Sequence, residues 1–84
     1  LNIIKKDGRK ELFEKEKLKK GLIKALEKRP VTLEKIDEII DKIEMCLRKL
    51  KTKDIDSKVL GEKVIKELKK LDDVAYLRFV SVYG

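Results

Sequence analysis

Four cations surround an Asp-Gly pair near the start of the chain, and together they could bind a phosphate group. They are Lys5, Lys6, Arg9 and Lys10, two on each side of Asp7-Gly8. Cations that converge on one point beside a helix N-terminus can hold a phosphate without a glycine-rich loop. The alternative interpretation is an ordinary solvated basic surface. Exposed ion pairs made by lysine contribute very little free energy, so cations at a surface need not have a specific role.

The positive charge of the chain is concentrated in the segment that contains these cations. Residues 1–30 hold eleven lysines and arginines against five acidic residues, a balance of +6. Residues 31–84 hold twelve against eleven, a balance of +1. Such a basic segment suits an anionic ligand or a nucleic acid backbone. Only Phe13 lies among the cations as an aromatic platform for stacking on bases.

No set of residues predicts catalysis, so we expect a binding domain and not an enzyme. The chain has no histidine and one cysteine, which excludes an internal disulfide, a histidine base and a zinc site made by this chain alone. Most acidic residues alternate with lysines at helical spacing, as on a solvated helix face. Cys46 lies in an apolar helical pattern, where a small buried residue is the simplest interpretation.

The cations are expected to lie on a β-hairpin over residues 2–13. Asp7-Gly8 favours a two-residue type I′ turn, because these residue types tolerate positive φ angles. Apolar pairs flank the turn, Ile3-Ile4 before it and Leu12-Phe13 after it. These pairs would form the two short strands.

Three amphipathic patterns follow the hairpin and predict helices. Pro30 is expected to stop the first, and Thr32 and Ser57 are expected to be N-caps of the next two. The second pattern resembles a coiled-coil seam, but it lasts under three heptads, so we interpret it as packing inside one domain. Ile55 could form a short strand before the third helix. The three helices are predicted at about residues 14–28, 33–50 and 57–70.

Two features of the C-terminal half have more than one interpretation. Gly61 weakens its helix by about 1 kcal/mol relative to alanine, unless it lets a ligand or another backbone come close. Residues 74–83 have the β-branched and aromatic composition of a strand, but the Asp72-Asp73 cap and the helical context favour a helix over residues 72–83. Tyr76 and Tyr83 are interpreted as core residues, with a subunit interface as the alternative.

These elements predict an α+β fold in a single domain over residues 1–84. A chain of this length buries only about 60 to 65% of its unfolded surface, so we expect marginal stability. No apolar run is long enough to span a membrane and no stretch resembles a secretion signal, so we expect a cytoplasmic protein without membrane contact. The ends of the sequence suggest a fragment of a longer protein.

The order of these motifs resembles the ATP-cone, a regulatory domain that binds ATP and dATP. The hairpin with Phe13, then Glu16-Lys17-Leu18, then Ser57 and Gly61, carry this resemblance. Residues 21–31 and 71–83 resemble the NrdR-type repressors of ribonucleotide reductase genes. The resemblance implies a three-stranded sheet, made of the hairpin and a short strand near Ile55, that covers a bundle of four helices.

The resemblance also implies which residues would meet the nucleotide. Lys5 and Lys6 would contact the phosphates, and Lys17 would reach the sugar or the phosphates. The family commonly has arginine at the position of Lys6, which here keeps its charge but lacks a bidentate fork. Ile3 and Phe13 would flank the base. The other residues at the nucleotide would be Glu11, accepting from the adenine amino group, Glu14, mainly through its backbone, Leu18 below it, and Ser57 and Gly61 from the third helix.

The function implied by the resemblance is regulatory. ATP or dATP, with magnesium, would change how cones associate with one another, and this association would control DNA binding by a repressor. Both zinc and DNA contact would belong to a preceding zinc ribbon, which is absent from this chain. One alternative is the N-terminal allosteric cone of a ribonucleotide reductase. A second alternative is a basic helical module that binds nucleic acid directly.

Overall fold

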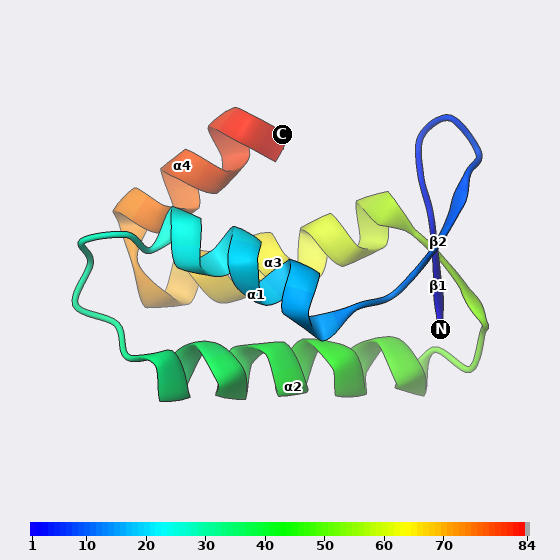
Figure 1. The fold of residues 1–84 in the computed structure, drawn as a ribbon, viewed down its shortest axis with the longest axis horizontal. Helices are drawn as coiled ribbons and strands as arrows, with labels where there is room; N and C mark the ends of the chain where they lie inside the picture. The colour runs from blue at the N-terminus through cyan, green and yellow to red at the C-terminus, as the bar shows by residue number, and fades with distance from the viewer. Residues whose placement is uncertain (84) are drawn as a thin grey trace.

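A three-stranded sheet covers one end of a group of four helices in the computed structural model (Figure 1). Helix α2 runs along one side, α1 and α3 lie next to it, and α4 lies farthest from it. The structure describes residues 1–83 and the side chains of residues 1–82. The architecture confirms the predicted α+β class. Its elements are β1 (Asn2–Ile4), β2 (Lys10–Leu12), α1 (Lys15–Ala25), α2 (Leu33–Lys49), β3 (Asp54–Asp56), α3 (Ser57–Leu71) and α4 (Asp73–Tyr83).

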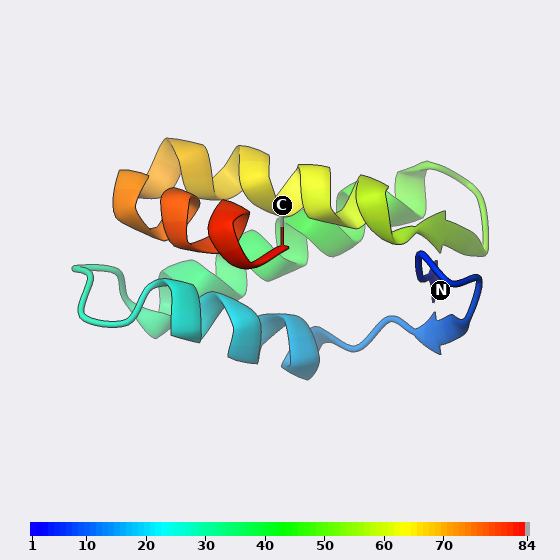
Figure 2. The same cartoon turned by 90° about the horizontal axis from the view of Figure 1, so that it is seen from above.

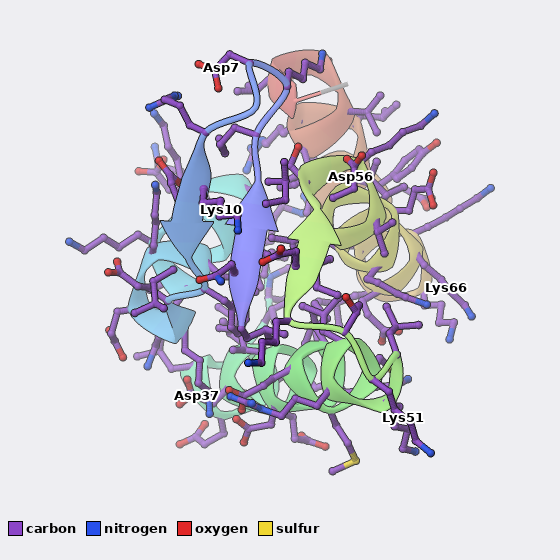
Figure 3. All side chains as sticks on the ribbon, turned by 90° about the vertical axis from the view of Figure 1, so that its right-hand side faces the viewer. Asp7, Lys10, Asp37, Lys51, Asp56 and Lys66 are labelled. Atoms are coloured by element: carbon purple, nitrogen blue, oxygen red, sulfur yellow. The ribbon has the colours of Figure 1, made fainter. Side chains whose placement is uncertain are left out.

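The sheet has the strand order β2-β1-β3, with β1 antiparallel to β2 and parallel to β3. Ile3 in the central strand is paired with Glu11 and with Ile55. Since alternate strand residues point to opposite faces, these three side chains share the face toward the helices, where Ile3 and Ile55 are buried. Lys10 lies on the outer face, as Figure 3 shows, and its Nζ is 3.3 Å from a carboxylate oxygen of Asp54.

The prediction of a two-residue type I′ turn in the hairpin is wrong. The Lys5 N–H donates to the Arg9 carbonyl at 2.8 Å, and the Gly8 N–H donates to the Lys5 carbonyl at 2.9 Å. Only Gly8 of this turn has a positive φ, of 88°. The loop therefore has three residues, with the glycine in the bulge position that commonly follows such a turn. Arg9 reinforces it by donating its backbone N–H and its Nε to the Asp7 carboxylate.

Helix α1 ends at Ala25, three residues before the predicted end at residue 28. Pro30 is not what stops it, because Lys28 already has a left-handed φ of 61°. The chain can leave the helix early because Arg78 of α4 donates from Nη1 to the carbonyls of Ala25 and Glu27, at 3.1 and 2.8 Å. Arg78 thus satisfies carbonyl groups at the C-terminal end of α1.

One of the two predicted N-caps is confirmed. The Thr32 hydroxyl accepts from the Lys35 N–H at 3.1 Å at the start of α2. Ser57 is the first residue of α3 and is not its cap, so that prediction is wrong. Asp56 has the extended backbone of a cap, and its carboxylate accepts from the Lys58 N–H at 2.8 Å.

The C-terminal segment is a helix, and the strand alternative is wrong. Its cap is Asp72, whose carboxylate accepts from the Ala75 N–H at 2.9 Å and pairs with Arg29 Nε at 2.9 Å. The buried side chains of α4 belong to Ala75 and Phe79. Tyr76 packs half-buried against the core, and the Tyr83 side chain lies outside the described residues.

The core forms within this one chain and draws most on α2. The apolar face of α2 is buried from Ile36 to Leu47, whereas Leu33 and Leu50, at the two ends of the predicted seam, are 58% and 47% exposed. Cys46 is half-buried and unbonded. Among the described helices, none is long and apolar enough to cross a membrane. The buried apolar residues are Ile3, Leu22, Ala25, Leu26, Ile36, Ile39, Ile40, Ile43, Leu47, Ile55, Val64, Leu68, Ala75 and Phe79.

The contacts of Asp72 predict a pH-dependent contribution to stability. The Ala75 N–H and the Arg29 guanidinium lower the pKa of Asp72 below its ordinary value of 3.8. A carboxyl group with a lowered pKa stabilises the fold above its unfolded-state pKa, and this contribution is lost as the pH falls through the folded-state pKa. Asparagine also caps helices, so Asp72→Asn removes the charge and keeps the cap. We expect Asp72→Asn to melt below wild type at pH 7 and to approach it in strong acid, as measured by thermal unfolding from pH 7 to 2.

The matched control is Asp73→Asn, at the exposed neighbouring position in the first turn of α4. Its melting temperature should follow wild type more closely at every pH. A difference between Asp72→Asn and wild type that stays constant from pH 7 to 2 would show that the charge of Asp72 contributes nothing.

Candidate ligand-binding cleft

A cleft of about 480 Å³ lies between the hairpin, α1 and α3, and Phe79 of α4 also reaches it. This volume is within the range of small-molecule sites, roughly 300 to 1,000 Å³. Figure 2 shows α1 on one side of the molecule, with α3 and α4 on the other side and the hairpin at the end. The lining residues are Ile3, Lys5, Lys6, Asp7, Arg9, Glu11, Leu12, Phe13, Glu14, Lys17, Leu18, Gly21, Ser57, Leu60, Gly61, Val64 and Phe79.

All ten residues that the resemblance places at a nucleotide line this one cleft. They come from both strands of the hairpin and its turn, from the connection to α1, and from the first turns of α1 and α3. The structure also adds residues that the sequence did not single out for the site. Gly21 follows Lys17 by one helical turn, and Leu60 and Val64 lie on the same side of α3 as Gly61. Phe79 has no local signal, because it lies far along the chain in α4.

The two ends of the cleft differ in chemistry. Lys5, Lys6 and Arg9 lie at the hairpin, whereas Leu60, Val64 and Phe79 give an apolar surface between the helices. Arg9 is held by Asp7, with Nε 2.7 Å from the carboxylate. Among the described residues, no carboxylate pairs with Lys5 or Lys6. These two ammonium groups are therefore available to an anionic ligand whose other part is apolar.

Other cations of the basic N-terminal segment are engaged away from the cleft. Lys10 binds Asp54 on the outer face of the sheet, so the four cations around the turn do not converge as the sequence suggested. In α1, Lys15 and Lys19 pair with α2 through Asp41 and Asp37, at 2.7 and 2.9 Å. The charge excess of residues 1–30 therefore serves two purposes, since part of it joins elements and part of it faces the cleft.

Glu11 and Lys17 connect the hairpin to α1 across the cleft. Lys17 Nζ lies 3.0 Å from the Glu11 carboxylate. The hydrogen bond from Lys17 lowers the pKa of Glu11, with smaller contributions from the charges of Lys5 and Arg9. Glu11 is therefore an ionised acceptor at neutral pH, and it lies on the helix-facing side of β2. Such a carboxylate can accept from an amino group of a ligand while it positions Lys17.

Two helix N-termini also lie beside the cleft. Helix α1 begins after Glu14, which has an extended backbone and makes no side-chain cap, and α3 begins at Ser57. Figure 2 shows that the first turns of both helices are on the side nearest the sheet. Unpaired N–H groups and the helix dipole make a helix N-terminus favourable for anions. At α3 the Asp56 carboxylate already accepts from the Lys58 N–H, whereas α1 has no side-chain cap, so the α1 end is the one that reinforces the positive potential of Lys5 and Lys6.

Comparison with known proteins identifies the family of this chain. Residues 1–84 match the family model described as the ATP cone domain. The chain belongs to the ATP-cone family. The resemblance that the motifs indicated is thereby confirmed.

This cone is similar over nearly its whole length to curated proteins named transcriptional repressor NrdR. It is 52% identical over 83 residues to the one from Petrotoga mobilis, which is 99% of this chain and 55% of the relative. It is 53% identical over 81 residues to the one from Thermotoga neapolitana, 96% of this chain and 52% of the relative. It is 53% identical over 83 residues to the one from Pelotomaculum thermopropionicum, which is 99% of this chain and 50% of the relative. The cone thus spans about half the length of these relatives, whose names describe repressors and not enzymes.

The described part of the cone contains no cluster of three or more cysteine or acidic side chains that could hold a metal ion. Four cations and three carboxylates line the cleft, and Asp7 and Glu11 are already paired with Arg9 and Lys17.

Proposed function

We propose that this cone binds ATP or dATP in the cleft and uses the nucleotide to regulate the protein that contains it. The observation that carries this proposal is the gathering of all ten residues named by the family resemblance around one cleft. The match of residues 1–84 to the ATP cone domain supports the same ligand. A cleft with a cationic end and an apolar end suits a nucleoside triphosphate.

In the proposed orientation the triphosphate position follows from the cationic end of the cleft, and the base position follows from the family resemblance. The triphosphate, with its magnesium ion, lies at Lys5, Lys6 and the uncapped N-terminus of α1. The base lies between Ile3 and Phe13, with its amino group donating to Glu11. A charge pair about 4 Å apart is worth about 4 kcal/mol at an effective dielectric of about 20, and a micromolar ligand needs about 8 kcal/mol. Two such pairs, reduced by exposure to solvent, and the apolar contacts together reach this range.

The proposed output is a change in association between cones. A ligand shifts such an equilibrium only by the difference between its affinities for the two states. The relatives are transcriptional repressors of about twice this length, so we assign DNA contact to a zinc ribbon outside this chain and not to the cone. The regulated genes would be those of ribonucleotide reductase, and the repressor would act in the cytoplasm.

The experiment that tests the proposal is thermal unfolding of the 84-residue chain with ATP, dATP, GTP or no ligand. Nucleotide at 100 times its dissociation constant should stabilise the fold by about 2.7 kcal/mol. For a domain of this size the melting temperature should rise on the order of 10 °C. We expect this rise with ATP or dATP, each with magnesium, and a smaller one with GTP, because guanine lacks the amino group at the position that donates to Glu11.

The same samples distinguish the alternatives. An equal rise with all three nucleotides would mean that the cleft reads phosphates and not the base. Absence of any rise with ATP and dATP would contradict the proposal. A basic nucleic-acid module would instead bind DNA without nucleotide, and that binding would weaken steeply between low and moderate salt.

A further inference from the structure

Two glycines face the cleft from opposite helices, and no contact or backbone angle within the protein requires glycine at either position. Gly21 lies in the interior of α1, and Gly61 lies near the start of α3. A methyl group added at either one would meet no atom within 4 Å outside its own stretch of helix. Neither has a positive φ, in contrast to Gly8 in the hairpin turn. Packing and backbone conformation would therefore both accept alanine at these positions.

Glycine in a helix is unfavourable, so its presence needs another reason. It loses more conformational freedom on folding than any other residue and is among the poorest helix formers. The space beside both glycines is the open cleft, since both line it. On α1, Gly21 comes one turn after Lys17 and three residues after Leu18, at the apolar end. A side chain at Gly21 would occupy the volume that a ligand would use.

We propose that Gly21 determines the shape of the site, by letting the nucleoside part of the ligand lie directly against the backbone of α1. This inference rests on the proposed nucleotide binding and adds a residue that the family resemblance did not assign. Gly61 would provide the same close approach on the α3 side. The chemistry fits a planar base or a ribose, because Leu60 and Phe79 supply apolar contacts at this end while Lys5 and Lys6 hold the phosphates at the other.

The test combines stability and affinity, which the proposal predicts will change in opposite directions. Gly21→Ala should raise the melting temperature without ligand by several degrees, about 4 to 8 °C, because alanine is the better helix former. It should weaken ATP and dATP binding, measured by isothermal titration calorimetry, by about tenfold or more, because one extra methyl overpacks a fitted contact. Gly21→Leu should abolish binding while the unliganded domain still unfolds cooperatively.

The matched control is Ile23→Ala, an uncharged change at an exposed position of α1 that does not line the cleft. It should bind ATP and dATP with the affinity of wild type. If wild type binds and Gly21→Ala and Gly21→Leu bind equally well, this inference is overturned and nucleotide binding stands. If wild type itself does not bind ATP or dATP, the proposed function fails, and the inference fails with it.

Discussion

The double variant Lys5→Ala, Lys6→Ala is expected to lose the ATP-dependent rise in melting temperature and to keep the melting temperature of the unliganded domain. Neither ammonium group pairs with a carboxylate among the described residues. The turn is held by the backbone of Lys5 and by the Arg9–Asp7 contact, which alanine at these two positions leaves in place. Removing the two side chains therefore affects the ligand and not the fold.

The expected loss of affinity is large. A hydrogen bond to a charged group contributes about 1.5 to 3 kcal/mol, so two of them correspond to at least about 3 kcal/mol and more than a hundredfold in affinity. At a nucleotide concentration that is 100 times the wild-type dissociation constant, the variant would be less than half saturated. Thermal unfolding and calorimetric titration with ATP and magnesium would both show the loss.

The control has to separate position from net charge. Lys10→Ala with Lys53→Ala also removes two cations near the sheet, but neither residue lines the cleft, and Lys10 binds Asp54 on the outer face. This double variant should retain most of the ATP-dependent rise. An equal loss in both variants would mean that the overall field attracts the nucleotide. Unfolding of Lys5→Ala, Lys6→Ala without ligand would show that these lysines are structural.

Local sequence patterns predicted the elements of this fold better than their ends. The period of apolar residues located α1, α2 and α3, because it records which face is buried, whereas α4 was predicted from its Asp72-Asp73 cap and the helical context. The ends depended on contacts with other elements. Arg78 of α4 binds the carbonyls at the end of α1, and no pattern within residues 14–28 contains that information. The cap of α3 moved by one position to Asp56, since the strand before it already held that residue in an extended conformation.

The cleft shows a similar division. The resemblance supplied ten residues because their order along the chain is a motif, but it did not supply Phe79, which reaches the cleft only when α4 packs on the other helices.

The position of Lys10 on the outer face of the sheet could have been predicted from the alternation of strand residues. Adjacent residues of a strand point to opposite faces, so Glu11 on the cleft side requires Lys10 to lie on the outer side. Grouping the four cations by sequence distance overlooked this alternation.

Leu47→Ala should have the largest effect on stability and little direct effect on the cleft. Leu47 is completely buried where α2 meets the core, and it does not line the cleft. Truncating a buried leucine to alanine costs about 2 to 5 kcal/mol. A domain of this size has a total stability of only about 4 to 13 kcal/mol. We expect a fall in melting temperature on the order of 10 to 30 °C, measured without ligand by thermal unfolding and urea titration.

The control Met45→Ala truncates an exposed side chain of the same helix, 60% accessible, and should change the stability by no more than about 0.5 kcal/mol. Equal losses from the two variants would contradict the packing of α2 described above. Saturating ATP should raise the melting temperature of folded Leu47→Ala, because stabilisation by a ligand depends on its concentration relative to the dissociation constant and not on the starting stability. Together with Lys5→Ala, Lys6→Ala, this variant separates the two properties, since one loses the ligand with the fold intact and the other weakens the fold with the cleft intact.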